Sequence, residues 1–217
     1  NQNFFFFFSR LNNKNNPNVD MTGWVLVNSD SQIKTWSGRT QESKNKDEIN
    51  VLDFGAGLGD STVAIQRAID YAASLSTNSN RKKVVIDIPV KVSKQRTHST
   101  GWGSVFTVPS NVVIEGTGCI FTDHLFANRC VIFLCRGSNI NVNWLTFNNT
   151  ATSASNYDIP VGGGTTYDDG LISGTTYSNI QCYQLLGLNS WNTCSFQMSN
   201  TDDGTVKFKD IEYIFCK

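Results

Sequence analysis

The chain has 217 residues, enough for one sizeable hydrophobic core or two small ones. Its 18 basic residues balance its 18 acidic residues, which argues against the broad basic surface that nucleic-acid binding needs. Only 17% of the residues are charged, while Asn, Ser and Thr are abundant, a composition typical of β-rich proteins with polar turns.

The N-terminal segment, residues 1–48, is polar and rich in Asn, Ser and Lys, and it ends in a linker-like run, SGRTQESKNKDE. The apolar run Phe4–Phe8 is far shorter than the roughly 20 residues of a transmembrane helix, so we predict no membrane insertion. It also lacks the basic leader and cleavage site of a signal peptide, and we assign it to a buried strand or a partner-covered surface.

One convincing helix is predicted, at residues 61–75 with the sequence STVAIQRAIDYAASL. Apolar residues recur there near the 3.6-residue period, and Ser61 or Thr62 can cap the helix N-terminus. Three glycines, Gly55, Gly57 and Gly59, stand directly before it, in an arrangement that lets a ligand phosphate approach a helix N-terminus.

The rest of the chain predicts strands and turns. No second amphipathic helix of ten or more residues appears between residues 80 and 217, so the chain lacks the crossover helices of a doubly wound parallel sheet. The predicted strands are KVVIDIPV (ended by Pro89), SVFTV, NVVIEG, CVIFLC, NINVNWLTF, NIQCYQLL, TCSFQM, TVKFKDI and EYIFC.

A weak internal repeat runs through these strands. SNVVIEG, SNINVNW, SNIQCYQ and KDIEYIF each place Asn or Asp before a β-branched residue, at Asn111, Asn139, Asn179 and Asp210. The intervals are 28, 40 and 31 residues, which favours a solenoid with loops of variable length. We expect the Asn side chains to stack at one corner and to hydrogen-bond to the backbone of neighbouring coils; the alternative is that Asn-Ile is simply a frequent turn-to-strand junction.

Two family resemblances compete for the glycine loop. VLDFGAGLG resembles the first motif of class I methyltransferases, which would make it an S-adenosylmethionine site with Asp87 as the ribose ligand. The whole stretch from residue 50 to 116 instead resembles the opening of the pectate-lyase-like right-handed β-helix superfamily, through VLDFGA, TVAIQRAID, IDIP and PSNVVIEGTG. The loop after Ala56 is shorter than usual in that superfamily, and PVKV replaces its glycine-bearing turn.

We favour the second resemblance, because the absence of further helices contradicts the first. It implies a mainly β fold, a right-handed parallel β-helix with an N-terminal capping helix, whose Ile65, Ala68, Ile69 and Ala72 face the first coil. The glycines would then form the tight turn into the cap, so no cofactor is implied.

Within that superfamily, the polar leader and the segment TGWVLVNSDSQIKTWSG resemble bacteriophage tailspikes. The resemblance implies a homotrimer in the virion tail, assembled in the bacterial cytoplasm and attached to phage tail or adaptor proteins through residues 1–48. Residues 49–217 would begin the β-helix that recognises, and often cleaves, host capsule or O-antigen polysaccharide, and we expect the natural chain to continue beyond Lys217. A secreted or surface polysaccharide lyase or hydrolase of the same fold is the alternative.

The six cysteines form no C-x-x-C pair and do not cluster with the two histidines, so a metal site is not predicted. Most lie in apolar runs, and we interpret them as reduced core residues, as in a protein that folds in a cytoplasm.

Catalysis, if present, is expected to use paired carboxylates, as in glycosidases. The candidates are two aspartate pairs that precede glycines, Asp168 with Asp169 and Asp202 with Asp203. Because Asp-Asp-Gly is also ordinary turn composition, and because further coils can carry the site, these assignments are hypotheses. Further carboxylate candidates are Asp158 and Glu212, and the aromatic residues considered as faces for sugar rings are Tyr167, Trp144 and Trp191.

Overall fold

The structure is a computed structural model of the whole chain. It describes residues 46–57, 59–93, 96–99, 101–122, 130–149, 158–168, 176–188, 194–197 and 206–217. The chain divides into two compact units, Asn1–Asp47 and Glu48–Lys217, and nearly all described residues belong to the second. The interpretation of Phe4–Phe8 and the attachment role of residues 1–48 therefore concern a segment that lies almost wholly outside the described residues.

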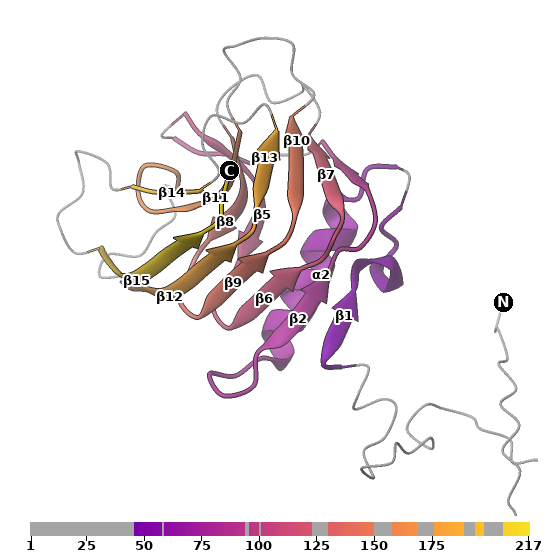
Figure 1. Cartoon of the computed structure of the whole chain (residues 1–217), viewed down its shortest axis with the longest axis horizontal. Helices are drawn as coiled ribbons and strands as arrows, with labels where there is room; N and C mark the ends of the chain where they lie inside the picture. Colours follow the sequence, from indigo (N-terminus) through magenta and orange to yellow (C-terminus); the bar gives the residue numbers. More distant parts are fainter. Residues whose placement is uncertain are drawn as a thin grey trace, which may run out of the picture. The chain divides into compact units, whose positions relative to one another are not determined.

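Three sheets make up the second unit (Figure 1). The first sheet contains, in spatial order, β1 (Glu48–Asn50), β2 (Lys82–Val85), β6 (Val112–Glu115), β9 (Ile140–Asn143), β12 (Thr176–Tyr183) and β15 (Lys207–Ile214). The second contains β13 (Leu186–Leu188), β10 (Thr146–Asn149), β7 (Cys119–Thr122) and β3 (Val90–Val92). The third contains β14 (Cys194–Phe196), β11 (Asp158–Gly163), β8 (Cys130–Cys135), β5 (Gly103–Val108) and β4 (Arg96–Thr97).

Successive coils visit the three sheets in turn, which makes the unit a parallel β-solenoid. Strands β6, β7 and β8 form one coil, and β9, β10 and β11 pair with them in parallel register to form the next. Among the described strands, only β4 pairs antiparallel, against the start of β5. The predicted solenoid is confirmed, and a doubly wound methyltransferase fold is wrong, because parallel strands here are joined by turns around a single core instead of by crossover helices.

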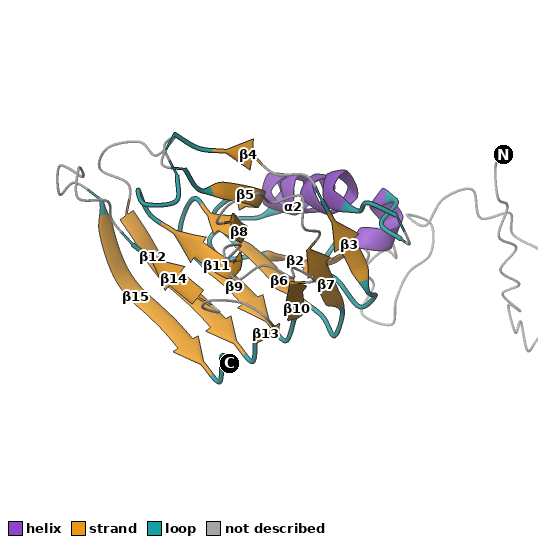
Figure 2. Ribbon diagram, turned by 90° about the horizontal axis from the view of Figure 1, so that it is seen from above, coloured by secondary structure: helices purple, strands orange, loops and turns teal. Residues whose placement is uncertain are grey.

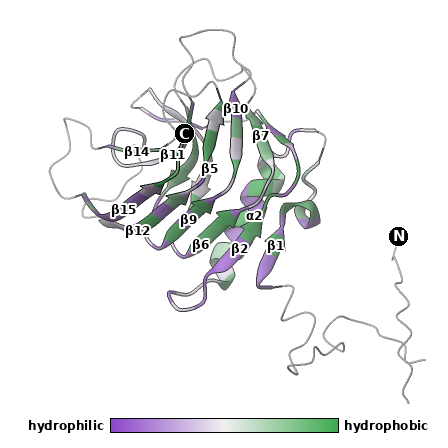
Figure 3. Ribbon diagram, viewed as in Figure 1, coloured by the Kyte–Doolittle hydropathy of each residue, from purple (hydrophilic) through white to green (hydrophobic). Residues whose placement is uncertain are grey.

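Alternation of apolar and polar side chains explains which face of each strand turns inward. β6 and β9 both bury their first and third residues, while the second and fourth lie at the outer surface. The inward residues of all three sheets join one core, in which Ile114, Val142 and Ile180 come from neighbouring coils. Figure 3 shows the resulting alternation of hydrophobic and hydrophilic residues along the strands.

The repeated Asn residues form the expected stack along the first sheet, directly before β6 and β9 and within β12. Asn139 Nδ2 donates to Asn111 Oδ1 (3.0 Å), and Asn179 Nδ2 donates to Asn139 Oδ1 (2.9 Å). The bonds therefore join side chain to side chain, whereas we expected the neighbours' backbone as partner. All four repeat residues, including Asp210, have a left-handed backbone, with φ between 53 and 67°. Asn and Asp tolerate this conformation best after Gly, which explains why they recur at this corner.

A second left-handed corner follows each of these residues at a distance of five positions. It is occupied by Gly116, Trp144, Gln184 and Phe215 in successive coils. The backbone N–H of Trp144 donates to Tyr183 O and that of Gln184 to Ile214 O, both at 2.9 Å, so the inter-coil hydrogen bonds continue through the turn. Gly116 is required in its coil, because a Cβ atom there would collide with the Ile86 backbone.

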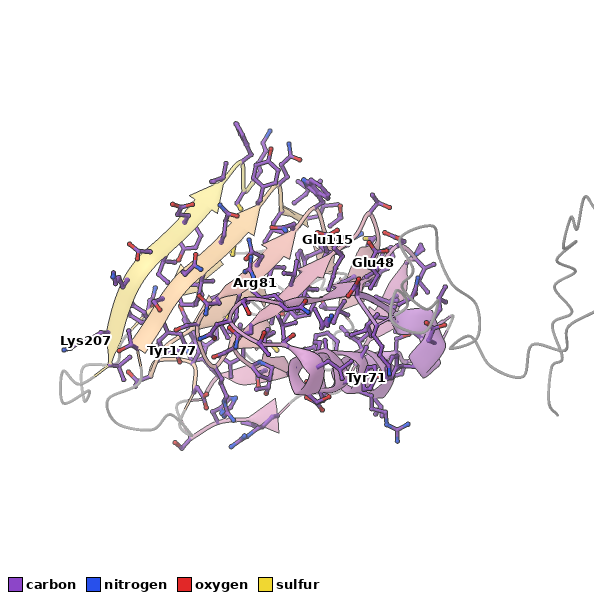
Figure 4. The ribbon with its side chains drawn as sticks, turned by 90° about the horizontal axis from the view of Figure 1, so that it is seen from below. Glu48, Tyr71, Arg81, Glu115, Tyr177 and Lys207 are labelled. Atoms are coloured by element: carbon purple, nitrogen blue, oxygen red, sulfur yellow. The ribbon has the colours of Figure 1, made fainter. Side chains whose placement is uncertain are left out.

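The outward face of the first sheet carries a chain of polar side chains that crosses the coils. The Arg81 guanidinium donates to Asn141 Oδ1, Asn141 Nδ2 donates to Gln181 Oε1 (2.9 Å), and Gln181 Nε2 donates to Glu212 Oε2 (3.0 Å). Nearer the cap, Lys83 pairs with Glu115 at 2.8 Å, and this hydrogen bond raises the pKa of Lys83. Arg81 and Glu115 are labelled on this face in Figure 4. The first sheet therefore presents a polar, hydrogen-bonded outer surface.

Helix α2 (Thr62–Leu75) covers one end of the coil stack, at the opposite end from β15 (Figure 2). The four residues predicted to face the first coil, Ile65, Ala68, Ile69 and Ala72, are all fully buried. The helix contacts β2 and β5, the strands of the first complete coil. The prediction of a capping helix is confirmed; it shields an apolar core and strand edges that would otherwise be open to solvent.

The glycine loop is part of the solenoid. A 3₁₀ turn, η2 (Val51–Phe54), ends at Gly55, whose φ of 92° requires glycine. Gly57 and Gly59 have no such constraint, contrary to our expectation; the Gly57 N–H instead donates to Ser61 Oγ at 3.1 Å. Ser61 N donates to Lys91 O, so the end of the loop pairs beside β3.

Ser61 is the N-cap residue of α2, as expected, but its side chain makes no capping hydrogen bond, and the Asp60 carboxylate takes that role. Asp60 Oδ1 accepts from the backbone N–H of Thr62 (2.9 Å) and from its hydroxyl (2.6 Å). The other carboxylate oxygen accepts from Ser93 Oγ (2.8 Å). Asp60 thus satisfies one backbone N–H of the first helical turn and fixes the helix to the segment after β3.

The side chain of Gln66 hydrogen-bonds to the backbone at an edge of the third sheet. Its Nε2 donates to Thr107 O (3.0 Å), and its Oε1 accepts from Thr107 N (2.9 Å). A side-chain amide therefore pairs with the backbone of β5 as a neighbouring strand would.

Some predicted strands divide differently in the structure. KVVIDIPV splits into β2 and β3 around Pro89, NINVNWLTF splits into β9 and β10 at the Trp144 corner, and TVKFKDI with EYIFC forms the single strand β15. The 40-residue repeat interval, from Asn139 to Asn179, spans β9, β10 and β11. No described helix is long and apolar enough to cross a membrane.

The Gln66 contact predicts a stability effect. Gln66→Met keeps the side-chain size but leaves the Thr107 N–H and C=O without this partner, so we expect a loss of about 1–2 kcal/mol in the free energy of unfolding. Urea denaturation measures it, with Arg67→Met, an exposed position on the same helix, as the control. Equal midpoints for the two variants would contradict the edge-pairing role.

Candidate functional site

The outer face of the third sheet is covered, unlike that of the first. Residues from β8 and β11 pack there with Trp102 and Tyr167, forming a second apolar cluster. The Trp102 and Tyr167 rings meet edge to face at 4.7 Å, and the Tyr167 hydroxyl lies 2.5 Å from Ser195 Oγ. Tyr167 is thus fully buried, which leaves no face of its ring open for a sugar.

Asp168, one of the predicted catalytic residues, lies inside this covered region. Arg136 holds it with two parallel hydrogen bonds: Nη2 donates to Oδ1 at 2.5 Å, and Nε donates to Oδ2. The Asp168 carboxylate is fully buried, whereas the Arg136 side chain is 26% exposed. His98 Nδ1 lies 3.7 Å from Asp168 Oδ1, and His98 Nε2 lies 2.9 Å from Ser104 Oγ.

Ser104, His98 and Asp168 occur in the order hydroxyl, imidazole, carboxylate, which are the groups of a nucleophilic triad. The surroundings oppose that role. Ser104 is only 2% exposed, so no substrate carbonyl reaches its hydroxyl in this conformation. Both Asp168 oxygens are also bound by Arg136, in the geometry of a structural bidentate ion pair. We interpret the network as a set of buried polar groups that hydrogen-bond to one another and fix the covering segments to the third sheet.

The other carboxylate candidates are separate from Asp168. Asp158 is buried and accepts from Thr122 Oγ1 at 2.5 Å, and Glu212 ends the polar chain of the first sheet. Asp169, Asp202 and Asp203 lie outside the described residues, as does Trp191. Their pairing in a catalytic site stays a prediction.

A row of aromatic side chains lies at the corner between the first and second sheets. This aromatic row consists of Trp144, Tyr183 and Phe215, one from each of three successive coils. The ring centroids are 6.2 Å apart between Trp144 and Tyr183 and 6.0 Å apart between Tyr183 and Phe215, both edge to face. Trp144 is 48% exposed and Tyr183 is half-buried. Of the aromatic residues considered for sugar binding, Trp144 keeps an open face.

All six cysteines are free thiols, four of them buried. Burial raises the pKa of Cys130 and Cys135. A hydrogen bond with Cys194 lowers the pKa of Cys216 to about 6. Within the described ranges, no group of three or more His, Cys, Asp or Glu side chains is arranged to hold a metal ion.

Sequence reasoning missed two parts of this picture. The partners of Asp168 gave no signal, because Arg136 and His98 are 32 and 70 positions away and carry no motif. The aromatic row did have a signal in the sequence, because its two corner members, Trp144 and Phe215, stand five residues after the repeated Asn139 and Asp210.

Comparisons with known proteins find sequence similarity to a phage tail spike protein over part of the chain. No protein-family model matches the chain. It is 38% identical over 85 residues to the tail spike protein of Shigella phage Sf6; the match covers 37% of this chain and 12% of the phage protein. Among solved structures, the A-module of mannuronan C-5 epimerase AlgE6 from Azotobacter vinelandii is similar with 20% identity and a TM-score of 0.42, over 77% of this chain and 46% of that one. The predicted resemblance to phage tailspikes is confirmed by a homologue of that name together with the β-solenoid.

The Arg136–Asp168 pair predicts an asymmetric mutational response. Arg136→Met removes the bidentate partner of a buried carboxylate, and we expect it to cost about 3–5 kcal/mol of unfolding free energy. Asp168→Asn costs less, because the partly exposed Arg136 can reach water, and the double variant is more stable than Arg136→Met alone. Denaturation of all three variants measures the coupling. Equal stability of Arg136→Met and wild type would contradict a structural role.

Proposed function

We propose that this chain belongs to a bacteriophage tailspike, a virion tail component that binds polysaccharide on the host surface. The observation that carries the proposal is the homology to a tail spike protein in a chain that folds as a parallel β-solenoid. Because the chain spans only 12% of that relative, the role of the whole protein is inferred from one of its parts.

The organisation of the chain fits this role. We propose that residues 1–48 attach the protein to phage tail or adaptor proteins and that residues 49–217 begin the polysaccharide-recognising solenoid. We also propose a homotrimer, and assembly in the host cytoplasm agrees with six unpaired cysteines, four of which are buried. The solenoid supplies what a receptor-binding shaft needs: a rigid body whose outer faces repeat from coil to coil.

Binding is the first test of the proposal. The full-length protein should bind at least one member of a panel of purified bacterial lipopolysaccharides and capsular polysaccharides, measured by biolayer interferometry, and the same polysaccharide should block adsorption of the phage. Native mass spectrometry should give a trimer. A monomer that is exported from its cell and degrades polysaccharide would contradict the tailspike and support a secreted enzyme of the same fold.

Depolymerisation is a separate proposal, and the aspartate pairs are its candidates. If Asp169, Asp202 or Asp203 acts as general acid or base, its change to Asn should lower the release of reducing ends by at least about 100-fold without altering the melting temperature. Asp168→Asn serves as the contrast, because the buried ion pair predicts a loss of stability for it. Full activity in all of these variants would place the catalytic carboxylates elsewhere.

A further inference from the structure

The outer faces of the first and third sheets and the corner between the first and second sheets differ in what they offer a partner. The first sheet presents side chains that already hydrogen-bond to one another across the coils. The outer face of the third sheet is covered by its own apolar cluster. The corner between the first and second sheets, in contrast, presents the aromatic row, with Trp144 about half exposed.

The backbone conformation at Trp144 is unfavourable for a large side chain. Its φ of 60° is a conformation that bulky residues rarely adopt and that costs about 1–3 kcal/mol. The equivalent corner of the preceding coil is occupied by Gly116, which carries no such cost and no side chain. Glycine would therefore serve the turn at position 144 without the strain, whereas about half of the tryptophan surface stays open to solvent. Gly116 contributes no side chain to the equivalent corner of the preceding coil.

The size of the row argues against a protein partner. An aromatic residue buries about 150–250 Å² when it is fully covered, so the 48% of Trp144 that is exposed amounts to roughly 100 Å². A stable protein interface needs about 800 Å² on each partner. The row is too small for that by itself, whereas a few sugar rings cover it.

We propose that the aromatic row binds a glycan chain that lies parallel to the solenoid axis, with the Trp144 ring as its principal contact. This inference rests on the proposed function and assigns a site to it. Sugar rings present apolar C–H faces to aromatic rings and hydroxyl groups to their surroundings. Thr146 and Asn148, on the outward side of β10, offer hydroxyl and amide groups beside the row. The row contributes one aromatic side chain per coil, which suits a linear chain of rings.

The decisive variant is Trp144→Gly. It removes the ring and also relieves the left-handed strain, so we expect an unchanged or higher melting temperature together with a dissociation constant at least tenfold larger. Gln184→Gly is the matched control, since Gln184 is exposed at the same left-handed corner one coil later. It should leave binding unchanged. Trp144→Phe should retain part of the affinity.

The measurement uses the full-length protein and the polysaccharide that binds wild type best in the panel described above. Unchanged affinity in Trp144→Gly would overturn the site and leave the proposed function standing. Absence of wild-type binding to every polysaccharide would instead refute the proposed function. A lower melting temperature in Trp144→Gly would show that the ring serves packing, and loss of the native oligomer would show that a second copy covers it; either result overturns the inference.

Discussion

Two left-handed residues five positions apart, repeated in successive coils of the first sheet, are the constraint on which the rest of the solenoid depends. Asn139 and Trp144 both have positive φ, and the four residues between them form β9. The same spacing separates Asn111 from Gly116 and Asn179 from Gln184. Because the corners recur at the same place, the coils superpose, their strands pair in parallel, and their inward residues meet in one continuous core.

The coil at each end of such a stack needs other contacts in place of a missing neighbour, since each coil is stabilised by its neighbours. At the N-terminal end, α2 buries Ile65 and Ile69 on the first coil, and Gln66 replaces a missing strand beside Thr107. Asp60 connects the helix start to the segment after β3. The glycine loop that resembles a cofactor site is thus the beginning of a coil, and its conformation follows from a 3₁₀ turn and a cap.

Polar and aromatic groups have different roles on the two sides of the molecule. Asp168 is fully buried and is bound by the partly exposed Arg136, so the effect of this pair falls on stability. At the aromatic row, backbone strain and ring exposure coincide at Trp144. Catalytic candidates chosen as acidic pairs before glycine could not be distinguished from buried structural carboxylates, because burial depends on segments far apart in the sequence.

The sequence by itself determined the parallel solenoid, the capping helix and the Asn stack. These features rest on local signals: a helical period, alternation along strands, and Asn at a corner that only Gly, Asn or Asp adopts readily. The tertiary structure alone decided that Asp168 meets Arg136 and His98, that Tyr167 is buried, and that Trp144 stands beside Tyr183. The contacts of Asp168 and Trp144 join residues at least 32 positions apart, and their proximity depends on loop lengths and coil register, which no local pattern encodes.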